Sequence, residues 1–571
     1  MVDDGQRRCT AAIGGVLGFG WFYLVVGHAI LNPTQLTWLM KGDSAIHLLG
    51  WLFFRQAPWQ FPLGAVPNLS YPVGTTVGFS DSIPWVAVAA KAMSPVLPVD
   101  FQYVGLWLGL CYVLQGYFGV RIVQELSASP FVQALGGAFF ILDPVPIRRL
   151  GHSSLAAHWL LLGVMWLHVH PCPASGARRR MLQMGVGFCA LSAGIHPYLA
   201  VSVLALSLAL LWKWHWGDHW LTGRQLLGWS AALSAVELGV LGLFGYLGAG
   251  MSLGAEGFGQ FAADALTLVN AAGASHLLPT LPYAPGQYEG FGYLGSGVLL
   301  LGLLGIALSW RSAKRPSGHA VKAVAPLVLC CTVLAVFALS PKIRIAGKLI
   351  VDMGYLYRPL MPMIAPIRGS GRFIWPFHYL LIMGAIMLWT RRRRRSQRLL
   401  HAVFIAAVLA QLVDGHTPLM QWFFNDIQEP NPALVDMDGW EGAAGGYEHL
   451  ALYPVPMIDA GWHGCARQEY AMADYISLGY KAYRLSLTFN GGYVARSDTR
   501  RMLQYCAEFE REIQEGKLGD KTIYVVQPAH WERFRGYAPQ ATCGRLTSQI
   551  VCVSSQSHAA FRQTLESRGM H

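Results

Sequence analysis

Charged residues are scarce in this chain of 571 residues. Asp, Glu, Lys and Arg make up 13% of the sequence, against roughly 25% in soluble domains, and 53% of the residues are apolar. The mean hydropathy is positive, at +0.36. This composition excludes an ordinary soluble domain and predicts an integral membrane protein.

Metal-binding cysteine patterns are also absent from the sequence. The ten cysteines form no CxxC motif and no Cys/His spacing typical of zinc, so we expect no structural metal site. The formal charge of +12 could indicate a nucleic-acid partner. The basic residues, however, cluster in short loops between apolar runs, where orientation signals lie, so we expect no nucleic acid.

Long apolar runs recur along the chain, and most are long enough to cross a hydrocarbon core of about 30 Å. The sequence predicts about eleven membrane spans: 12–31, 101–123, 129–145, 153–170, 181–195, 198–214, 225–247, 294–310, 323–340, 373–390 and 399–414. The first could be a signal peptide, but no clear cleavage site follows it, which favours an uncleaved anchor. The segment 83–97 contains two prolines and Lys91, so we expect a helix lying on the membrane.

Basic residues predict the orientation of these spans. With the N-terminus inside, four successive inner loops carry the positive charge that cytoplasmic loops prefer: Arg178 to Arg180, Lys213, Arg224, Arg311, Lys314, Arg315, Lys322, Arg391 to Arg395 and Arg398. The outer loops are then 32–100, 144–152, the turn near 196, 248–293 and 341–372. An odd number of spans places the tail outside too. We therefore expect a multi-pass membrane protein with a cytoplasmic N-terminus.

The tail changes character after residue 414. Strand-like runs at 449–453, 480–487 and 522–526 alternate with a helix from Asp498 to Glu515, which favours an α/β domain. One face of that helix should be filled by Met502, Leu503, Cys506, Phe509 and Ile513. The predicted organisation is an all-α polytopic membrane domain, residues 1–414, followed by an extracytoplasmic α/β domain, residues 415–571.

Four cysteines lie in the tail, in a compartment that would permit disulfides. They are Cys465, Cys506, Cys543 and Cys552, and four cysteines allow three pairings. Cys543 and Cys552 flank an expected hairpin, which favours that pair, with Cys465–Cys506 as the other.

Two acids mark the first outer loop as a candidate catalytic site. Asp43 follows the first span, and His47 lies four residues later, on the same face of a helix. Asp81 precedes the segment 83–97, and Ser80-Asp81-Ser82-Ile83-Pro84 resembles a helix N-cap with proline in the first turn. Asp43 could equally be a solvated loop acid or a cap, and Asp81 could serve only as a cap.

Positive charge is unusually dense in two outer loops. The loop 341–372 carries Lys342, Arg344, Lys348, Arg358, Arg368 and Arg372 against one acid, Asp352, and the turn 144–152 adds Arg148, Arg149 and His152. The planar fork of arginine matches phosphate oxygens, so a phosphate or pyrophosphate group would explain the cluster. Lipid head groups or nearby acids are the alternative partners.

The charged residues of the loop 248–293 are all acidic. The loop contains Glu256, Asp264 and Glu289 without Lys or Arg, and its end combines aromatic rings with carboxylates, including Tyr288 and Glu289. Sugar recognition uses such mixtures, but so do many wet loops. His196, between two spans near the outer face, is a further candidate for sugar or acceptor binding or a buried turn residue.

Taken together, an acid in the first outer loop, a proline-containing surface segment, many spans and an outer C-terminal domain resemble the GT-C superfamily of membrane glycosyltransferases. The stretches Tyr71-Pro72-Val73-Gly74, Asp81-Ser82-Ile83-Pro84 and Arg368-Gly369-Ser370-Gly371-Arg372-Phe373 are similar to those of its uncharacterised bacterial branches. The resemblance implies that Asp43 is the catalytic acid and Asp81 a supporting one. The second outer loop lacks the Asp-x-Asp of metal-dependent oligosaccharyl transferases, so no metal ligand is assigned and a need for Mg²⁺ or Mn²⁺ stays open.

The resemblance implies transfer of a sugar from a polyprenyl-phosphate donor to an envelope glycan or lipid acceptor, with inversion. Asp43 would be the general base, and the donor phosphate would lie against Arg148, Arg149, Arg368, Arg372, Lys342 and Arg344. One alternative is a polysaccharide polymerase or ligase that uses a pyrophosphate-linked donor. Another is a transporter or flippase of lipid-linked sugars, which would need polar residues near mid-span, where Glu237 is the clearest.

Overall fold

A computed structural model describes residues 4–171, 175–248, 257–309, 318–364, 366–390, 397–415, 431–456, 465 and 472–569. These residues form two compact units. The helical unit comprises Met1–Asn32, Val104–Val240 and Ala255–Gln428, and the mixed unit comprises Pro33–Tyr103, Leu241–Gly254 and Glu429–His571. The sequence did not indicate that the first outer loop would group with the tail.

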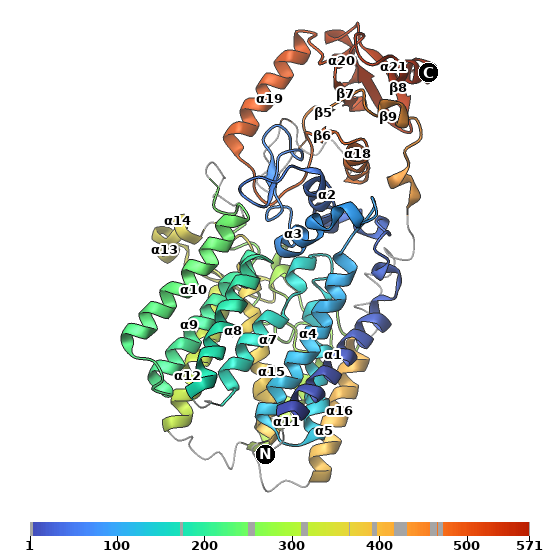
Figure 1. The fold of residues 1–571 in the computed structure, drawn as a ribbon. Coiled ribbons are helices and arrows are strands. Elements are labelled where there is room, and N and C mark those ends of the chain that lie inside the picture. Colours follow the sequence, from blue (N-terminus) through green and yellow to red (C-terminus); the bar gives the residue numbers. More distant parts are fainter. Residues whose placement is uncertain are drawn as a thin grey trace. The chain divides into compact units, whose positions relative to one another are not determined.

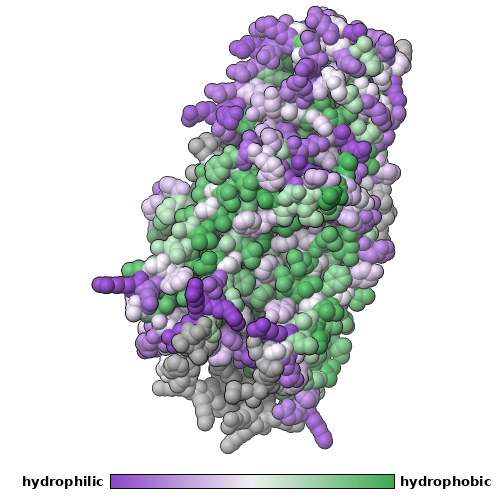
Figure 2. All heavy atoms as spheres, in the orientation of Figure 1, coloured by the Kyte–Doolittle hydropathy of each residue, from purple (hydrophilic) through white to green (hydrophobic). Residues whose placement is uncertain are grey.

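Long apolar helices build the helical unit, where they lie alongside one another (Figure 1). They are α1 (Asp4–Val26), α4 (Val104–Leu126), α5 (Pro130–Ile141), α7 (Trp159–Val169), α8 (Ser175–Ala193), α9 (Pro197–Trp212), α10 (Gly223–Leu243), α11 (Ser296–Ser309), α12 (Gly318–Ala338), α15 (Trp375–Thr390) and α16 (Gln397–Gly415). Apolar side chains predominate over the middle of the visible face of these helices, and hydrophilic ones gather toward their lower end in the view (Figure 2).

Eight helices among the described residues are long and apolar enough to cross a membrane. Shorter apolar stretches, Ser153–Val169 and Ser296–Leu308, coincide with two further predicted spans, and α8 coincides with another. The basic residues at the start of α8 lower its hydropathy. The prediction of a multi-pass helical membrane protein is confirmed, whereas the count of eleven crossings is not.

Glycine allows α1 and α4 to approach closely. A Cβ atom added to Gly116 would lie 2.1 Å from the carbonyl oxygen of Gly14, and one added to Gly18 would lie 2.2 Å from that of Tyr112. Small residues spaced four apart, such as Gly14 and Gly18, are typical of membrane helices whose backbones touch. A larger side chain at any of these positions would force the two helices apart.

The mixed unit begins with two short helices, α2 (Gly42–Gln56) and α3 (Pro84–Ala92), separated by the strand pair β1 (Ala65–Val66) and β2 (Thr75–Thr76). At 1.5 Å per residue, the nine residues of α3 span about 14 Å, too little to cross a bilayer core of about 30 Å. The prediction that this segment does not cross is confirmed.

The tail forms a five-stranded sheet in the order β6-β5-β7-β9-β8. Strands β5, β6 and β7 are parallel, and β9 runs antiparallel to both of its neighbours, β7 and β8. The elements are β5 (His449–Tyr453), α18 (Met472–Arg484), β6 (Thr488–Phe489), α19 (Thr499–Gln514), β7 (Thr522–Val526), α20 (Trp531–Tyr537), β8 (Thr542–Leu546), β9 (Gln549–Val553) and α21 (Ala559–Ser567). The predicted α/β class of the tail is confirmed.

Two details of the tail differ from the prediction. The run 480–487 is not a strand, because residues 480–484 end α18 and bury Tyr480 and Tyr483, three positions apart, on one helix face. In α19, Met502, Cys506, Phe509 and Ile513 are buried as predicted, but Leu503 is 54% exposed. The N-cap Asp498 accepts a hydrogen bond from the Arg501 backbone nitrogen and fixes where α19 begins.

Both favoured disulfides are present. Cys543 and Cys552 face each other across β8 and β9, with Cα atoms 4.1 Å apart. Cys465 is bonded to Cys506, with a Cα separation of 5.3 Å. The prediction of both pairs is confirmed.

Several residues named in the sequence lie outside the described ranges. They are Glu256, Arg311, Lys314, Arg315 and Arg391 to Arg395. The predicted membrane orientation, which depends on several of them, stays a prediction.

Candidate functional site

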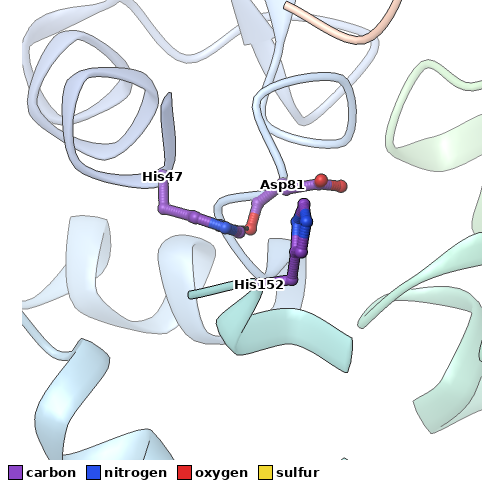
Figure 3. A group of neighbouring side chains, drawn as sticks. All are labelled: His47, Asp81 and His152. Carbon is purple, nitrogen blue, oxygen red and sulfur yellow. Dashed lines mark hydrogen bonds between the residues drawn. The ribbon is translucent and has the colours of Figure 1, made fainter. Parts of the chain in front are cut away.

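Asp43 lies in the first turn of α2, where its side chain is exposed. His47, one turn later, is buried, at 1% exposure. The Nδ1 atom of His47 hydrogen-bonds the main-chain oxygen of Asp81 (Figure 3). His152, the third side chain drawn in Figure 3, belongs to the helical unit.

The predicted capping role of Asp81 is wrong. The N-cap residue of α3 is Ile83, and no side chain caps that helix. Asp81 and Ile83 have φ angles of +53° and +51°, a region that non-glycine residues seldom occupy. The Asp81 carboxylate points away from the His47 ring (Figure 3).

Hydrogen bonds hold this unusual turn against α2. Ser82 Oγ donates to the His47 carbonyl at 2.9 Å, and Tyr103 donates its hydroxyl to the Ser82 carbonyl. A Cβ atom on Gly50 would lie 2.1 Å from Ser80 Oγ, so only glycine permits this approach. Asp43, His47 and Asp81 therefore belong to one braced substructure of the mixed unit.

Within the helical unit, the charged candidates converge on Glu289. Glu289 lies in the 3₁₀ turn η6 (Gln287–Gly290) and is 6% exposed. Its Oε2 accepts from Arg149 Nη1 at 2.8 Å and from Arg372 Nε at 2.9 Å, and its Oε1 accepts from Arg372 Nη2 at 3.1 Å. His152 Nε2 lies 4.0 Å from Oε1. One buried carboxylate thus holds two guanidinium groups.

Arg149 is the more deeply buried of the two arginines. Its Nη2 also donates to the carbonyls of Tyr288 and Glu289, at 3.1 and 2.7 Å, and its guanidinium lies 5.3 Å from the centre of the Trp375 ring. Burial lowers the pKa of the Arg149 guanidinium, and the negative charge of Glu289 opposes this effect. Arg149 therefore fixes the backbone that carries Glu289.

Arg372 connects Glu289 to a second group of predicted residues. It lies in the turn η8 (Ser370–Ile374), and its guanidinium is 4.6 Å from the centre of the Tyr198 ring. The Tyr198 hydroxyl accepts from the Gly369 backbone nitrogen at 2.7 Å. His196 caps α9, since its Nδ1 accepts from the Tyr198 backbone nitrogen, so His196 has a structural role here.

Electrostatics keep Glu289 ionised. Burial alone would raise the pKa of its carboxyl, but the charges of Arg372 and Arg149 outweigh burial and hold the pKa well below its ordinary value. A charge-assisted pair of this kind is strong when both groups are desolvated and well hydrogen-bonded.

The remaining basic candidates lie on neighbouring segments of the helical unit. Arg148 donates to the Ala272 carbonyl at 3.3 Å and lies 4.9 Å from the centre of the Phe291 ring. Arg368 is 4.5 Å from the centre of the Phe261 ring, which contacts Tyr288. Among the described residues of the cluster, Arg148, Arg149, Arg368 and Arg372 thus outnumber the carboxylate of Glu289 at its centre.

Lys342 and Arg344 are placed differently. Both lie on strand β3 (Lys342–Ile345), which pairs with β4 (Lys348–Asp352) as a hairpin. Asp264 accepts from the backbone nitrogens of Ala346 and Gly347 at its tip. Asp264 therefore braces the hairpin, and Arg344 Nη1 donates to the Gly347 carbonyl at 3.2 Å within the same hairpin.

Glycines allow the two functional turns to touch. A Cβ atom on Gly371 would lie 2.6 Å from Gly290 Cα. Gly371 is thus explained by a close backbone approach between the turn with Arg372 and the turn with Glu289.

Sequence reasoning missed a buried polar bridge beside this site. His378 on α15 hydrogen-bonds the Gly292 carbonyl through Nδ1 at 2.8 Å and Asp143 Oδ1 through Nε2 at 3.1 Å, and neither side chain is exposed. Asp143 also caps α6 (Pro144–Ile147). The sequence does contain a signal for this bridge, because His378 is an ionisable residue within the apolar span 373–390, and such a residue is by itself a reason to expect function.

A second pair extends the same buried region. His158 Nδ1 lies 2.8 Å from the Tyr379 hydroxyl, which also accepts from Gln115 Nε2 at 3.1 Å. The His158 ring packs on Trp375 at 4.4 Å between centres, and Trp375 donates to the Phe291 carbonyl at 3.2 Å. The turn that carries Glu289 is therefore held from several sides.

Comparison with known proteins gives a family and two distant structural likenesses. No curated protein matches the sequence. An ArnT from Cupriavidus metallidurans bound to undecaprenyl phosphate has 12% identity and a TM-score of 0.44, over 95% of this chain and 99% of that chain. The archaeal oligosaccharyltransferase AglB from Archaeoglobus fulgidus, in complex with an inhibitory peptide and a dolichol-phosphate, has 9% identity and a TM-score of 0.43, over 96% and 74%.

TM-scores below 0.5 are too low to assign function or site residues to this chain. The family models are more informative, because they cover most of the sequence. The model described as "Domain of unknown function (DUF6311)" matches residues 15–416, and the "DUF6311 C-terminal domain" matches residues 439–554. The chain therefore belongs to the DUF6311 family.

Proposed function

We propose that the protein is a membrane glycosyltransferase that moves a sugar from a polyprenyl-phosphate donor to an envelope glycan or lipid acceptor on the extracytoplasmic face. The observation that carries the proposal is the arginine cluster around Glu289. Positive charge removed from water is costly unless it is balanced, and the described residues of the cluster include more arginines than carboxylates. A phosphate group would supply the missing negative charge.

The arginines would have different roles in the site. Arg149 makes three hydrogen bonds to Glu289 and to backbone carbonyls, so it anchors the site. Arg372 is the more exposed of the two, with 12% of its side chain accessible against 3% for Arg149. We therefore assign the donor phosphate to Arg372, with Arg148 and Arg368 beside it and Lys342 and Arg344 at the loop hairpin.

Chemistry would follow as a single displacement. The acceptor hydroxyl attacks the anomeric carbon, the new glycosidic C–O bond forms as the C–O bond to phosphate breaks, and the leaving polyprenyl phosphate keeps the electron pair. Asp43 takes the hydroxyl proton, a contribution of about 10² to 10⁴-fold for general-base catalysis. Arginines already aimed at the phosphate favour the charge that develops on it. Inversion follows from one displacement.

Other candidates have secondary roles in this scheme. Asp81, braced near His47, would support Asp43. Tyr288 is 49% exposed and, with His152, offers a surface for the sugar or the acceptor. Glu289 holds Arg372 in position.

Transfer by purified protein in proteoliposomes tests the proposal. Radiolabelled sugars on polyprenyl phosphate are supplied with an envelope lipid fraction, with and without a chelator to test for a divalent cation. Asp43→Asn should abolish transfer while the protein remains folded. Arg372→Lys keeps the charge but loses the two-pronged contact, so it should raise the KM for the donor more than that for the acceptor.

Arg484→Gln is the matched control, since Arg484 forms a partly exposed ion pair with Asp100 in the mixed unit. Its transfer rate should equal the parental rate. Transfer by Asp43→Asn at the parental rate would remove Asp43 from the mechanism. Use of pyrophosphate-linked donors alone would favour a polymerase or ligase, and movement of intact lipid-linked sugar across the bilayer would favour a flippase.

A further inference from the structure

An exposed apolar surface lies between two candidate membrane spans of the helical unit. It includes the second half of the β3–β4 hairpin and continues through three short turns, α13 (Gly354–Tyr357), η7 (Arg358–Leu360) and α14 (Met361–Ile364). We call residues 345–363 the exposed segment. Its large apolar side chains with at least about a third of their surface accessible are Ile345, Leu349, Ile350, Val351, Tyr355, Leu356, Leu360, Met361 and Met363.

This exposure is unusual for a segment outside the spans. Met363 is 78% exposed and Tyr355 67%, and every residue of β4 is exposed, so the part of the chain that the structure describes covers neither face of that strand. Single exposed apolar residues need no explanation, but a contiguous group marks a protein or membrane interaction site.

The hairpin that presents this surface is well braced. The Ala265 backbone nitrogen donates to the Arg344 carbonyl at 2.9 Å, and Met353 donates to Pro341 at 2.7 Å. Asp264 holds the hairpin tip through two backbone nitrogens. The apolar side chains are therefore displayed by ordered backbone.

Chain connectivity keeps the segment close to the membrane. It joins the candidate spans Val321–Ala338 and Ser370–Thr390, and the helices of these spans, α12 and α15, pack against each other. Two consecutive spans that pack together leave and re-enter the membrane at the same face. The segment between them therefore lies on one side of the membrane, with both of its ends at the boundary between lipid and water.

Charge indicates which lipids the surface would contact. Lys342, Arg344, Lys348 and Arg358 border the apolar side chains, against the single acid Asp352. Basic residues around an apolar face are typical of elements that lie in the membrane interface and attract anionic head groups.

We propose that the exposed segment is an interfacial anchor, whose apolar side chains enter the boundary between head groups and acyl chains of an anionic bilayer. The anchor would fix the height of the loop that ends in Arg368 and Arg372 relative to the membrane. The inference concerns lipid binding and holds whether or not the protein transfers sugars.

Photo-crosslinking in nanodiscs tests the anchor. The full chain is made with p-benzoylphenylalanine in place of Tyr355 or Met363, and reconstituted in phosphatidylglycerol or phosphatidylcholine. Mass spectrometry of the illuminated protein should show lipid adducts at both positions, severalfold more in phosphatidylglycerol. Leu503 on α19, exposed but isolated, is the control position and should give a lower adduct yield.

Charge variants complete the test. Lys348→Gln with Arg358→Gln should remove the preference for phosphatidylglycerol while adducts to both lipids remain. Adducts to a second copy of the chain instead of lipid, yields no higher than at Leu503, or equal yields in the two lipids for the parental charges would overturn the proposal. Size-exclusion profiles equal to that of the parent show that the labelled proteins are folded.

Discussion

Replacing Glu289 with glutamine should destabilise the protein more than any change of a surface ion pair. The carboxylate accepts three hydrogen bonds, one from Arg149 and two from Arg372, at 2.8 to 3.1 Å. Glutamine keeps one oxygen, but its amide group places a donor against a guanidinium donor. Arg149, 2% exposed, would also lose its negative partner.

The expected loss of stability in Glu289→Gln follows from the burial of the Glu289–Arg149 pair. Removing one partner of a buried pair costs about 3 to 5 kcal/mol, because the other charge remains desolvated. The matched surface change is Arg484→Gln, whose side chain and its partner Asp100 are 36% and 33% exposed. Exposed pairs contribute about 0 to 1 kcal/mol, so Arg484→Gln should have little effect.

Thermal unfolding in one detergent, followed by near-UV circular dichroism, measures both variants against the parent. We expect Glu289→Gln to lower the Tm by several degrees and Arg484→Gln to leave it nearly unchanged. Adding Arg149→Met to Glu289→Gln should restore part of the loss, because the desolvated charge is then gone. Equal Tm values for Glu289→Gln and Arg484→Gln would refute the view that the carboxylate balances buried arginines.

Three further outcomes are expected. The folded-state pKa of Glu289 is lowered from 4.5, so its contribution to stability should be fully present above pH 4.5 and decline as the pH falls toward the lowered pKa. When the Tm is measured as a function of pH, Glu289→Gln should lack this decline. Intact mass of the alkylated, unreduced tail should show no free thiol among its four cysteines, whereas four free thiols would contradict the disulfides. Reporter fusions should place Arg391 to Arg395 in the cytoplasm and the end of the chain outside, and a cytoplasmic tail would reverse the predicted orientation.

Local patterns in the sequence were sufficient to predict most of the fold. The apolar runs fall on helices, and β5, β7 and α19 lie where periodicity placed them, because burial of one face leaves a repeat in the sequence. The prediction for 480–487 failed because Tyr480-Lys481-Ala482 and Leu485-Ser486-Leu487 alternate apolar and polar residues, as a strand does. In α18, Tyr480 and Tyr483 are instead buried three positions apart, as on one face of a helix.

The site was less accessible to sequence reasoning, because its contacts join distant positions. Arg149 and Arg372 are 140 and 83 residues from Glu289, so residue type predicted a basic cluster but could not identify the acid that holds it. The turn at Asp81 was missed for another reason. A β-branched residue such as Ile83 with positive φ breaks the usual preference, and such conformations persist only where surrounding contacts impose them.

The turn that carries Glu289 is fixed by independent contacts on several segments. Trp375 and His378 of α15 bond the carbonyls of Phe291 and Gly292, and Thr267 Oγ1 donates to the Gly290 carbonyl at 2.6 Å. Arg149 bonds the turn from the other side. Charge held in this way needs no rearrangement when an anion arrives, which is the condition under which fixed dipoles and charges stabilise a transition state most effectively. Under the proposed function, the buried bridge from Asp143 through His378 would therefore affect catalysis by keeping Glu289 and Arg372 in place, without contacting the substrate.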